Sequence, residues 1–424
     1  MIYLLTEQSP SFEAEPTFWQ KITGHRALFV YLAVLLASLI LLMLLLIIRN
    51  AREVRTREAE KKLAKEKRRF SRLCEADARA KSMPKALPDD DIELSSLCDR
   101  FRDFAASRMG LYYEPEVIRT FISALSVSRL VIMQGISGTG KTSLAYAFGK
   151  FVLHEATIVP VQPSWKDRTD MLGYYNEFTG TFTETELLDM IYEANRSDRI
   201  FTAVLDEMNI ARVEYYFAEF LSVLELPDPE SRKIEVVSDT RDNDPELIKG
   251  GKLSVPDNIW FIGTANNDDS TLSISDKVYD RAMVIELQSR AKPFTAPDTD
   301  PVILSAPHLF SLFDKARGDF SMSDELRRKI ERIDAYLTSR LGITFGNRIM
   351  TQTERFIPVF RACGGTEDQA ADLILSKKVL RKLELQNPVY VSAEADGLIS
   401  ELNNVFGDGV MRHCLSYVGK FVRL

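Results

Sequence analysis

The run GISGTGKT, from Gly135 to Thr142, constrains this chain more than any other feature of the sequence. Four residues separate its outer glycines, and Lys-Thr follows directly. The preceding RLVIMQ (129–134) is typical of a buried strand, and the following SLAYAFGKFV (143–152) of a helix. A loop in that position turns backbone N–H groups inward at a helix N-terminus, which favours polyphosphate. The sequence therefore predicts a phosphate-binding loop for a nucleoside triphosphate.

Within this loop, the ammonium group of Lys141 is predicted to reach the β- and γ-phosphates, and the hydroxyl of Thr142 to bind Mg²⁺. The alternative is a glycine-rich turn with a chance lysine, which the flanking strand and helix disfavour. The predicted nucleotide-binding residues of the segment are Gly135, Ser137, Gly138, Thr139, Gly140, Lys141, Thr142 and Ser143.

A second segment, FTAVLDE (201–207), ends an apolar run with two carboxylates. A buried strand would deliver both at its C-terminal edge, where ligands collect in an open α/β sheet. Asp206 is predicted to hold Mg²⁺, and Glu207 to orient and deprotonate the attacking water. An acidic pair after a strand is more often a helix cap, but its place downstream of a phosphate loop favours catalysis.

Further apolar runs lie at 157–161, 258–264 and 283–287. With the strands at 129–134 and 201–207 they predict a parallel five-stranded sheet in an α/β fold. The run NIWFIGT leads into the polar segment 265–269, and SDKVYDR (275–281) leads into MVIEL. Each strand thus lies next to polar residues that can serve a site.

The motifs GISGTGKT, LDEMN, GTANNDD and SDKVYDRA together resemble the AAA+ NTPases, and among them the McrB-like branch. That branch contains the GTP-using motor subunits of modification-dependent restriction systems. The resemblance covers about Phe101 to Leu424, and the stretch 162–174 is similar as well. It implies an AAA+ α/β core over 97–300 and a C-terminal helical lid over 301–424, where SDELRRKIERIDAYL begins with Ser323 and Asp324 as candidate caps.

The resemblance also implies roles for three further residues. Asn266 resembles the polar sensor that positions the lytic water, and Arg281 the arginine finger inserted into the neighbouring subunit's site. Arg348, in FGNR, resembles a lid-domain sensor, with an arginine that only bonds a helix surface as the alternative.

The sequence departs from the McrB pattern at the sensor. McrB proteins usually carry Met-Asn-x-x-Asp-Arg, whereas here Ala265 precedes Asn266 and Ser270 follows Asp269. The phosphate loop reads only phosphates and does not distinguish adenine from guanine. We therefore expect ATP with Mg²⁺, with GTP as the alternative.

The second strong feature is ALFVYLAVLLASLILLMLLLII, residues 27–48, which contains no charged residue. At ~1.5 Å per residue a helix of this length spans the ~30 Å hydrocarbon core. A signal peptide would have a shorter apolar region and end near a small-residue cleavage site, whereas this run ends in an arginine-rich segment. The sequence predicts one transmembrane helix over 27–48.

Charges around this run predict its orientation. Residues 49–80 are dense in lysine and arginine, and the segment 1–26 has only Lys21 and Arg26. The positive-inside rule predicts a single-pass protein of the cell (inner) membrane with 1–26 outside and the NTPase in the cytoplasm. Residues 49–80 are predicted to form a basic helical stalk, either solvated near anionic headgroups or binding nucleic acid, and 81–96 a linker.

The remaining features limit the partners. The net charge of −7 gives no global signature of nucleic-acid binding, so any such contact would be local. Charged and turn residues fill 227–256, where Lys233–Val237 and Lys252–Val255 could pair as a hairpin.

We therefore expect a membrane-anchored AAA+ NTPase that works as a homo-oligomeric ring, expected to be a hexamer, and remodels a bound partner. The resemblance to McrB implies the motor of a prokaryotic defence system whose nuclease or other effector is a separate subunit. The alternatives are a MoxR-like membrane-associated chaperone and a nucleotide-gated scaffold with little turnover.

Overall fold

The computed structural model describes residues 18–66, 68–80, 88–266 and 271–422. The chain divides into two compact units, residues 1–67 and residues 68–424, and each is described by itself. Most of the predicted outer segment (1–17), part of the predicted linker (81–87) and part of the GTANNDD motif (267–270) lie outside the described residues.

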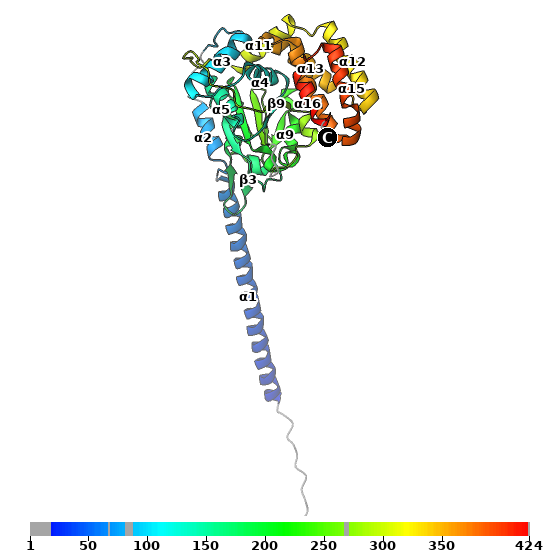
Figure 1. The fold of residues 1–424 in the computed structure, drawn as a ribbon. Coiled ribbons are helices and arrows are strands. Elements are labelled where there is room, and N and C mark those ends of the chain that lie inside the picture. The colour runs from blue at the N-terminus through cyan, green and yellow to red at the C-terminus, as the bar shows by residue number, and fades with distance from the viewer. Residues whose placement is uncertain (1–17, 67, 81–87, 267–270, 423–424) are drawn as a thin grey trace, which may run out of the picture. The chain divides into compact units, whose positions relative to one another are not determined.

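The first unit is one uninterrupted helix, α1 (Phe18–Glu66), as Figure 1 shows. Its stretch Phe29–Glu58 has a mean hydropathy of 3.1 over its most apolar part, and the side chains there are exposed among the residues that the structure describes. The helix continues through the end of the apolar run, where Arg49 pairs with Glu53 one turn later at 3.3 Å. By length and composition α1 is able to cross a membrane.

A five-stranded parallel sheet forms the centre of the second unit, in the spatial order β2-β5-β8-β1-β9. This confirms the predicted α/β fold and its five strands. The bounds are β1 (Leu130–Gly135), β2 (Thr157–Pro160), β5 (Phe201–Asp206), β8 (Ile259–Asn266) and β9 (Met283–Leu287).

Both faces of the sheet are covered, which explains why its strands are apolar runs and not alternating patterns. Val131 and Met133 face one core and Leu130 and Ile132 face the other. The first core includes α3 (Leu94–Met109), α4 (Pro115–Val127) and α5 (Lys141–Phe151), and the second includes α7 (Glu186–Ala194).

Short elements connect these layers. Two antiparallel hairpins lie outside the main sheet, and the second of them is the one predicted between 233 and 255. The hairpins are β3 (Gly173–Asn176) with β4 (Thr181–Glu184), and β6 (Lys233–Glu235) with β7 (Lys252–Ser254). The helical turns are α6 (Thr169–Leu172), η1 (Met208–Ile210), α8 (Val213–Tyr216), α9 (Ala218–Val223), η2 (Pro229–Ser231) and α10 (Asp276–Tyr279).

The C-terminal region is helical, as predicted, and is drawn from yellow to red in Figure 1. Ser323 caps its second helix by accepting a hydrogen bond from the backbone N–H of Leu326. The elements are α11 (Ala306–Asp319), α12 (Asp324–Leu341), α13 (Asn347–Ala362), α14 (Glu367–Ile374), the π-helical turn η3 (Leu375–Val379), η4 (Leu380–Leu385), α15 (Pro388–Phe406) and α16 (Arg412–Val422).

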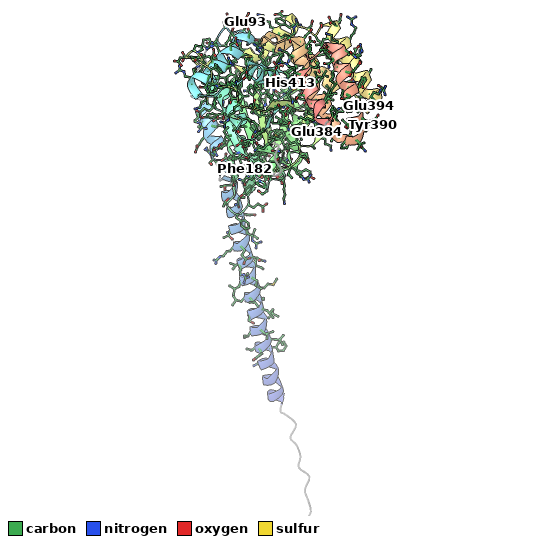
Figure 2. All side chains as sticks on the ribbon, in the orientation of Figure 1. Glu93, Phe182, Glu384, Tyr390, Glu394 and His413 are labelled. Carbon is green, nitrogen blue, oxygen red and sulfur yellow. The ribbon has the colours of Figure 1, made fainter. Side chains whose placement is uncertain are left out.

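Residues 68–80 differ from the predicted basic stalk. They belong to the compact second unit, and α2 (Arg72–Ala80) is a separate helix from α1. The side chain of Arg69 is fully buried: Nε and Nη2 donate to the carboxylate of Asp244 at 2.7 and 2.6 Å, and Nη1 to Asp239 at 2.5 Å. Phe70 packs on Phe182 of β4 (labelled in Figure 2), with ring centroids 4.8 Å apart.

The first turn of α2 is held by the same hairpin. The carboxylate of Glu184, at the end of β4, accepts hydrogen bonds from the backbone N–H groups of Ser71, Arg72 and Leu73 at 2.9 to 3.0 Å. Further along α2, the carboxylate of Asp77 accepts from the backbone N–H of Glu246 at 3.0 Å. The segment 69–80 therefore fastens the hairpin β3–β4 and the loop 239–246 to the body.

Replacing Arg69 should destabilise the second unit. In Arg69→Met, the buried carboxylate of Asp244 loses its bidentate partner, and the free energy of unfolding should fall by about 3 kcal/mol. Urea unfolding of a fragment that starts at residue 68 measures this. Arg68→Met, at an exposed neighbouring position, is the matched control and should leave stability unchanged. Equal stability of both variants would contradict the fastening role.

Candidate functional site

The predicted phosphate loop lies between β1 and α5, and Gly140 precedes the first residue of α5. Gly138 and Gly140 adopt φ values of 78° and 92°, which glycine tolerates and other residues rarely do. Gly135 has φ 146°, and a Cβ there would lie 2.1 Å from the carbonyl oxygen of Leu287 on β9. The glycines therefore allow a tight loop at the N-terminus of α5, where the helix dipole favours an anion.

Lys141 is buried within this loop. Its Nζ donates to the carbonyl oxygens of Gly135 and Ile136, each at 2.9 Å. Thr139 Oγ1 donates to the same Ile136 carbonyl at 2.9 Å, which closes the loop on itself. The ammonium group of Lys141 thus lies against the backbone of the loop; its contact with phosphate stays a prediction.

The structure brings Thr142 and Asp206 together. Thr142 Oγ1 donates to Asp206 Oδ1 at 2.7 Å, across the gap between α5 and the end of β5. Thr264 Oγ1, on β8, donates to the same carboxylate oxygen at 2.8 Å. A hydroxyl and a carboxylate side by side are hard oxygen donors of the kind that Mg²⁺ prefers, together with water and phosphate oxygens. These residues therefore fit the predicted metal ion.

Glu207 follows directly and is exposed, in the left-handed conformation with φ 53° and ψ 45°. A residue with a side chain is strained there by about 1 to 3 kcal/mol, and such residues cluster at functional sites. The backbone N–H of Glu207 donates to Thr264 Oγ1 at 2.9 Å, which helps to hold the conformation. Thr264 thus positions both members of the acidic pair.

Asn266 ends β8 level with Gly135, because the two residues are partners in the parallel register of β8 and β1. Its carbonyl accepts from Asn209 Nδ2 at 2.9 Å, and the same amide group reaches the carbonyl of Leu272 at 3.3 Å. Asn209 is buried, in the turn after the acidic pair. It therefore joins the turn after β5 to the chain on both sides of residues 267–270.

Sequence reasoning assigned no role to four side chains at this edge. Thr264 and Asn209 were visible within GTAN and LDEMN, but nothing marked what they contact. Arg290, after β9, donates from Nε to the carbonyl of Gly138 at 2.6 Å, and the hydroxyl of Tyr113 donates to the carbonyl of Gly140 at 3.0 Å. Burial raises the pKa of the Tyr113 hydroxyl well above its usual range, so this group stays a donor.

Arg281 lies at the opposite edge of the sheet. The backbone carbonyl of Arg281 accepts from Ser128 Oγ at 2.7 Å, just before β1 begins. Its guanidinium group pairs with Glu225 through Nε at 2.8 Å, and Nη1 donates to the carbonyl of Lys277 at 2.8 Å. Arg281 is therefore not part of the phosphate-loop cluster of its own chain.

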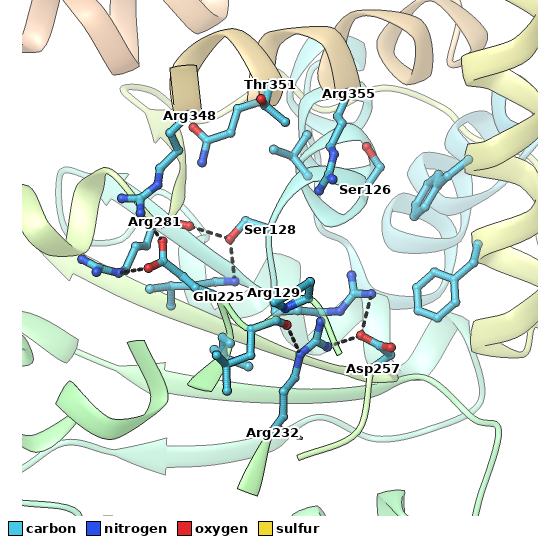
Figure 3. A pocket seen from close by; sticks show the side chains of 18 of the residues that line it. Ser126, Ser128, Arg129, Glu225, Arg232, Asp257, Arg281, Arg348, Thr351 and Arg355 are labelled. Atoms are coloured by element: carbon cyan, nitrogen blue, oxygen red, sulfur yellow. Dashed lines mark hydrogen bonds and ion pairs between the residues drawn. The ribbon is translucent and has the colours of Figure 1, made fainter. Parts of the chain in front are cut away.

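Arg348 lies beside Arg281 and away from the phosphate loop. Figure 3 shows both arginines converging on Glu225, whose second carboxylate oxygen is 2.8 Å from Arg348 Nη2. Arg348 comes from the first turn of α13 and Arg281 from the turn after α10. The structure thus brings the two together and separates both from Lys141, Asp206, Glu207 and Asn266.

Comparison with known proteins gives one sequence relationship. No family model matches the chain. It is 24% identical over 173 residues to the EcoKMcrB subunit of the type IV methyl-directed restriction enzyme of Escherichia coli (strain K12). The match covers 39% of this chain and 36% of that subunit, so the chain spans about a third of the length of the relative it matches.

Two solved structures resemble the chain distantly. One is a protein of Cytophaga hutchinsonii, provisionally described as an ATPase, with TM-score 0.47 and 12% identity over 77% of this chain and 92% of that one. The other is a full-length MCM homolog from Methanopyrus kandleri, with TM-score 0.38 and 13% identity over 69% of this chain and 62% of that one.

Adding a side chain at Gly135, the first residue of the phosphate loop, should abolish tight nucleotide binding. In Gly135→Ala, the new methyl group would collide with the carbonyl of Leu287 and push β1 and the loop away from β9. We expect ATP affinity to fall about tenfold or more, measured by titration calorimetry. Gly318→Ala on α11, where the methyl group meets nothing within 4 Å, is the control. Unchanged affinity in Gly135→Ala would argue against this loop as the binding site.

Proposed function

We propose that this chain, whose α/β fold and partial sequence relationship are those of an AAA+ ATPase related to McrB, binds Mg·ATP at the phosphate loop and hydrolyses it in an oligomeric ring. The observation that carries the ring is the position of Arg281. Because β1 runs from Leu130 to Gly135 at ~3.3 Å per residue, roughly 17 Å of sheet separate Arg281 from its own phosphate loop. An arginine so placed does not reach the phosphate loop of its own chain, so we assign it to the site of a neighbouring subunit.

Each side chain at the phosphate-loop edge has a proposed task. Lys141 binds the β- and γ-phosphates, and the Thr142 hydroxyl and the Asp206 carboxylate hold Mg²⁺. Bound Mg²⁺ would neutralise charge on the phosphates. Glu207 orients the attacking water and accepts its proton, and Asn266 positions the same water from the adjacent strand. The strained backbone of Glu207 supports this role, because such conformations cluster at functional sites and this residue directly follows the end of β5.

The pair Arg281 and Arg348 is proposed to act on the neighbour's triphosphate. In the single chain their charges are balanced by Glu225. A triphosphate offers stronger acceptors to guanidinium groups than one carboxylate, so it would replace Glu225 when a neighbour docks. Arg348 would then be a sensor for the adjacent subunit and not for its own.

The lid region holds the turn that presents Arg281. The buried Lys378, in η3, donates from Nζ to the carbonyls of Tyr279 and Ala282 at 2.7 and 2.6 Å. Gln352 Nε2 on α13 donates to the carbonyl of Asp280 at 3.1 Å. A movement of the lid would therefore move Arg281, which couples one subunit's lid to its neighbour's hydrolysis.

We further propose ATP as the nucleotide, with GTP as the alternative, and a McrB-like defence motor as the biological setting, with the effector on another chain. The partial match to the EcoKMcrB subunit supports this setting. A MoxR-like chaperone shares the same chemistry, and salt-sensitive DNA binding by the assembled ring separates the two.

The apolar helix α1 is proposed to anchor the chain in the cell membrane, with residues 1–26 outside and the ATPase in the cytoplasm. Its exposed apolar surface and the arginines that follow it support this placement.

Membrane fractionation tests the anchor. The full chain should stay in the membrane after alkaline carbonate washing, and a variant lacking residues 27–48 should become soluble, because the apolar span is gone. Arg49→Gln with Arg52→Gln is the control, since it keeps the span and should remain in the membrane. A full chain found in the soluble fraction would contradict membrane anchoring.

Mixing two inactive variants tests the shared site. Arg281→Ala should keep ATP affinity but lose about 10³-fold or more in turnover, because the transition-state charge is left unneutralised. Glu207→Gln should also be inactive. A mixture should regain activity, since a subunit with intact Glu207 can receive Arg281 from the other variant. The control is Arg328→Ala, an exposed arginine on α12.

The outcomes of the mixing experiment separate three readings. Recovered turnover supports sites shared between subunits. No recovery at any ratio, with Arg281→Ala inactive, would contradict action in a neighbouring subunit. Tight ATP binding without turnover in the unmodified chain, at every protein concentration, would favour the nucleotide-gated scaffold.

A further inference from the structure

A cavity of about 1110 Å³ opens at the amino-terminal edge of the sheet, between the start of β1, α11 and α13. Figure 3 shows α13 above it, with Arg355 directed toward the segment that contains Ser126. The volume suits a ligand of nucleotide size. Six arginines line the cavity: Arg129, Arg232, Arg281, Arg317, Arg348 and Arg355.

The acidic side chains that line the cavity do not balance these arginines. They are Glu225, Asp257 and Asp314, so the six arginines leave an excess of three positive charges. Glu225 is shared by Arg281 and Arg348, as described above. Asp257 pairs with Arg232 and lies 3.5 Å from Arg129, and Asp314 pairs with Arg317 at 2.7 Å while largely exposed.

Glu225 and Asp257 each lie beside two of the arginines, whereas Asp314 pairs only with Arg317, so Arg355 is the lining arginine without an acidic partner among the lining residues. Arg355 has no hydrogen bond or ion pair to any residue in the described part of the chain, and it lines the same cavity as Arg317. Among the described residues, the buried Nε atoms of Arg317 and Arg129 have no hydrogen-bond partner. A buried N–H donor without a hydrogen-bond partner lowers the stability of the fold, and a bound ligand with an acceptor group would remove this penalty.

The electrostatics agree with this geometry. Burial is the main cause that lowers the pKa of Arg129 to about 10; the charge of Asp257 opposes this shift, and the nearby charges of Arg232 and Arg317 contribute to it. Burial likewise lowers the pKa of Arg317, and the charge of Arg355 adds to the effect. Neighbouring guanidinium groups destabilise one another's charged form, and an anion bound between them stabilises the charged form of each.

One wall of the cavity is apolar. Phe310 and Phe313 of α11 line it opposite Leu221 and Leu224. Phe310 also lies against the guanidinium group of Arg129, 4.8 Å from its ring centroid. An aromatic wall next to a cationic end suits a ligand with a flat apolar part and a phosphate part.

We propose that this cavity binds a phosphate-bearing ligand, whose phosphate contacts Arg317 and Arg355, apart from the pair Arg281 and Arg348. The ligand comes from one of two sources: a free phosphorylated molecule, or the nucleotide held by a neighbouring subunit. The inference does not depend on hydrolysis by this chain, because it rests on the cavity and its charges.

The test uses the full chain in detergent, titrated with pyrophosphate and with ATP in a calorimeter. Lys141→Ala removes high-affinity binding at the phosphate loop and is the background for the first arm. In this background we expect a saturable site that weakens as salt is added. Adding Arg317→Gln and Arg355→Gln should weaken it about tenfold or more, because two charge-assisted hydrogen bonds are lost. Arg328→Gln is the matched control.

The second arm uses the chain with Lys141 intact, at protein concentrations where it assembles. If Lys141→Ala binds neither probe, but Arg317→Gln with Arg355→Gln weakens ATP binding only in the assembled state, the ligand is the neighbour's nucleotide. Arg355→Gln alone serves where the double variant unfolds, since Arg355 is exposed. If these variants change binding in neither arm, the proposal is wrong.

Discussion

Parallel pairing of the five central strands is the constraint on which the other features depend. Because the strands run the same way, every carboxyl end lies at one edge, and Thr142, Asp206 and Asn266 meet there from α5, β5 and β8. The same constraint sends the turns before β1 and β9 to the other edge, with Arg281 among them. One chain thus carries two chemically different edges, one with a lysine, hydroxyl groups and carboxylates and one rich in arginines.

Much of the fold follows from local sequence signals. Each strand of the parallel sheet is an unbroken apolar run, so its position was predictable to within two residues, and the glycine pattern identified the loop after β1. The order of the strands was not predicted from the sequence, whereas the helical C-terminal region was. The partial match to the EcoKMcrB subunit agrees with the resemblance that the motifs carry. Ser323 is an example of such a local signal, because a helix cap depends only on residues within one helical turn.

What the sequence could not predict depends on contacts between distant segments. From the sequence, Arg69 was assigned to the basic stalk, because its partners Asp239 and Asp244 lie far along the chain. Arg348 resembled a lid sensor, but its neighbours depend on the packing that brings the start of α13 to Glu225, which no spacing reveals. Asn209 likewise lay within the LDEMN motif, but the motif did not indicate that its side chain contacts the carbonyl of Asn266. Such residues become visible only when the tertiary structure places their partners.

The attachment of residues 69–80 has a mechanical consequence. A force applied along the backbone at residue 68 enters the body first through the Arg69 ion pairs and the packing of Phe70 on Phe182. The hydrogen bonds of α2 then transmit this force to the hairpin β3–β4 and to the loop 239–246, before it reaches the central sheet. The contacts of Arg69 are therefore the first to carry such a force, and the central sheet is the last.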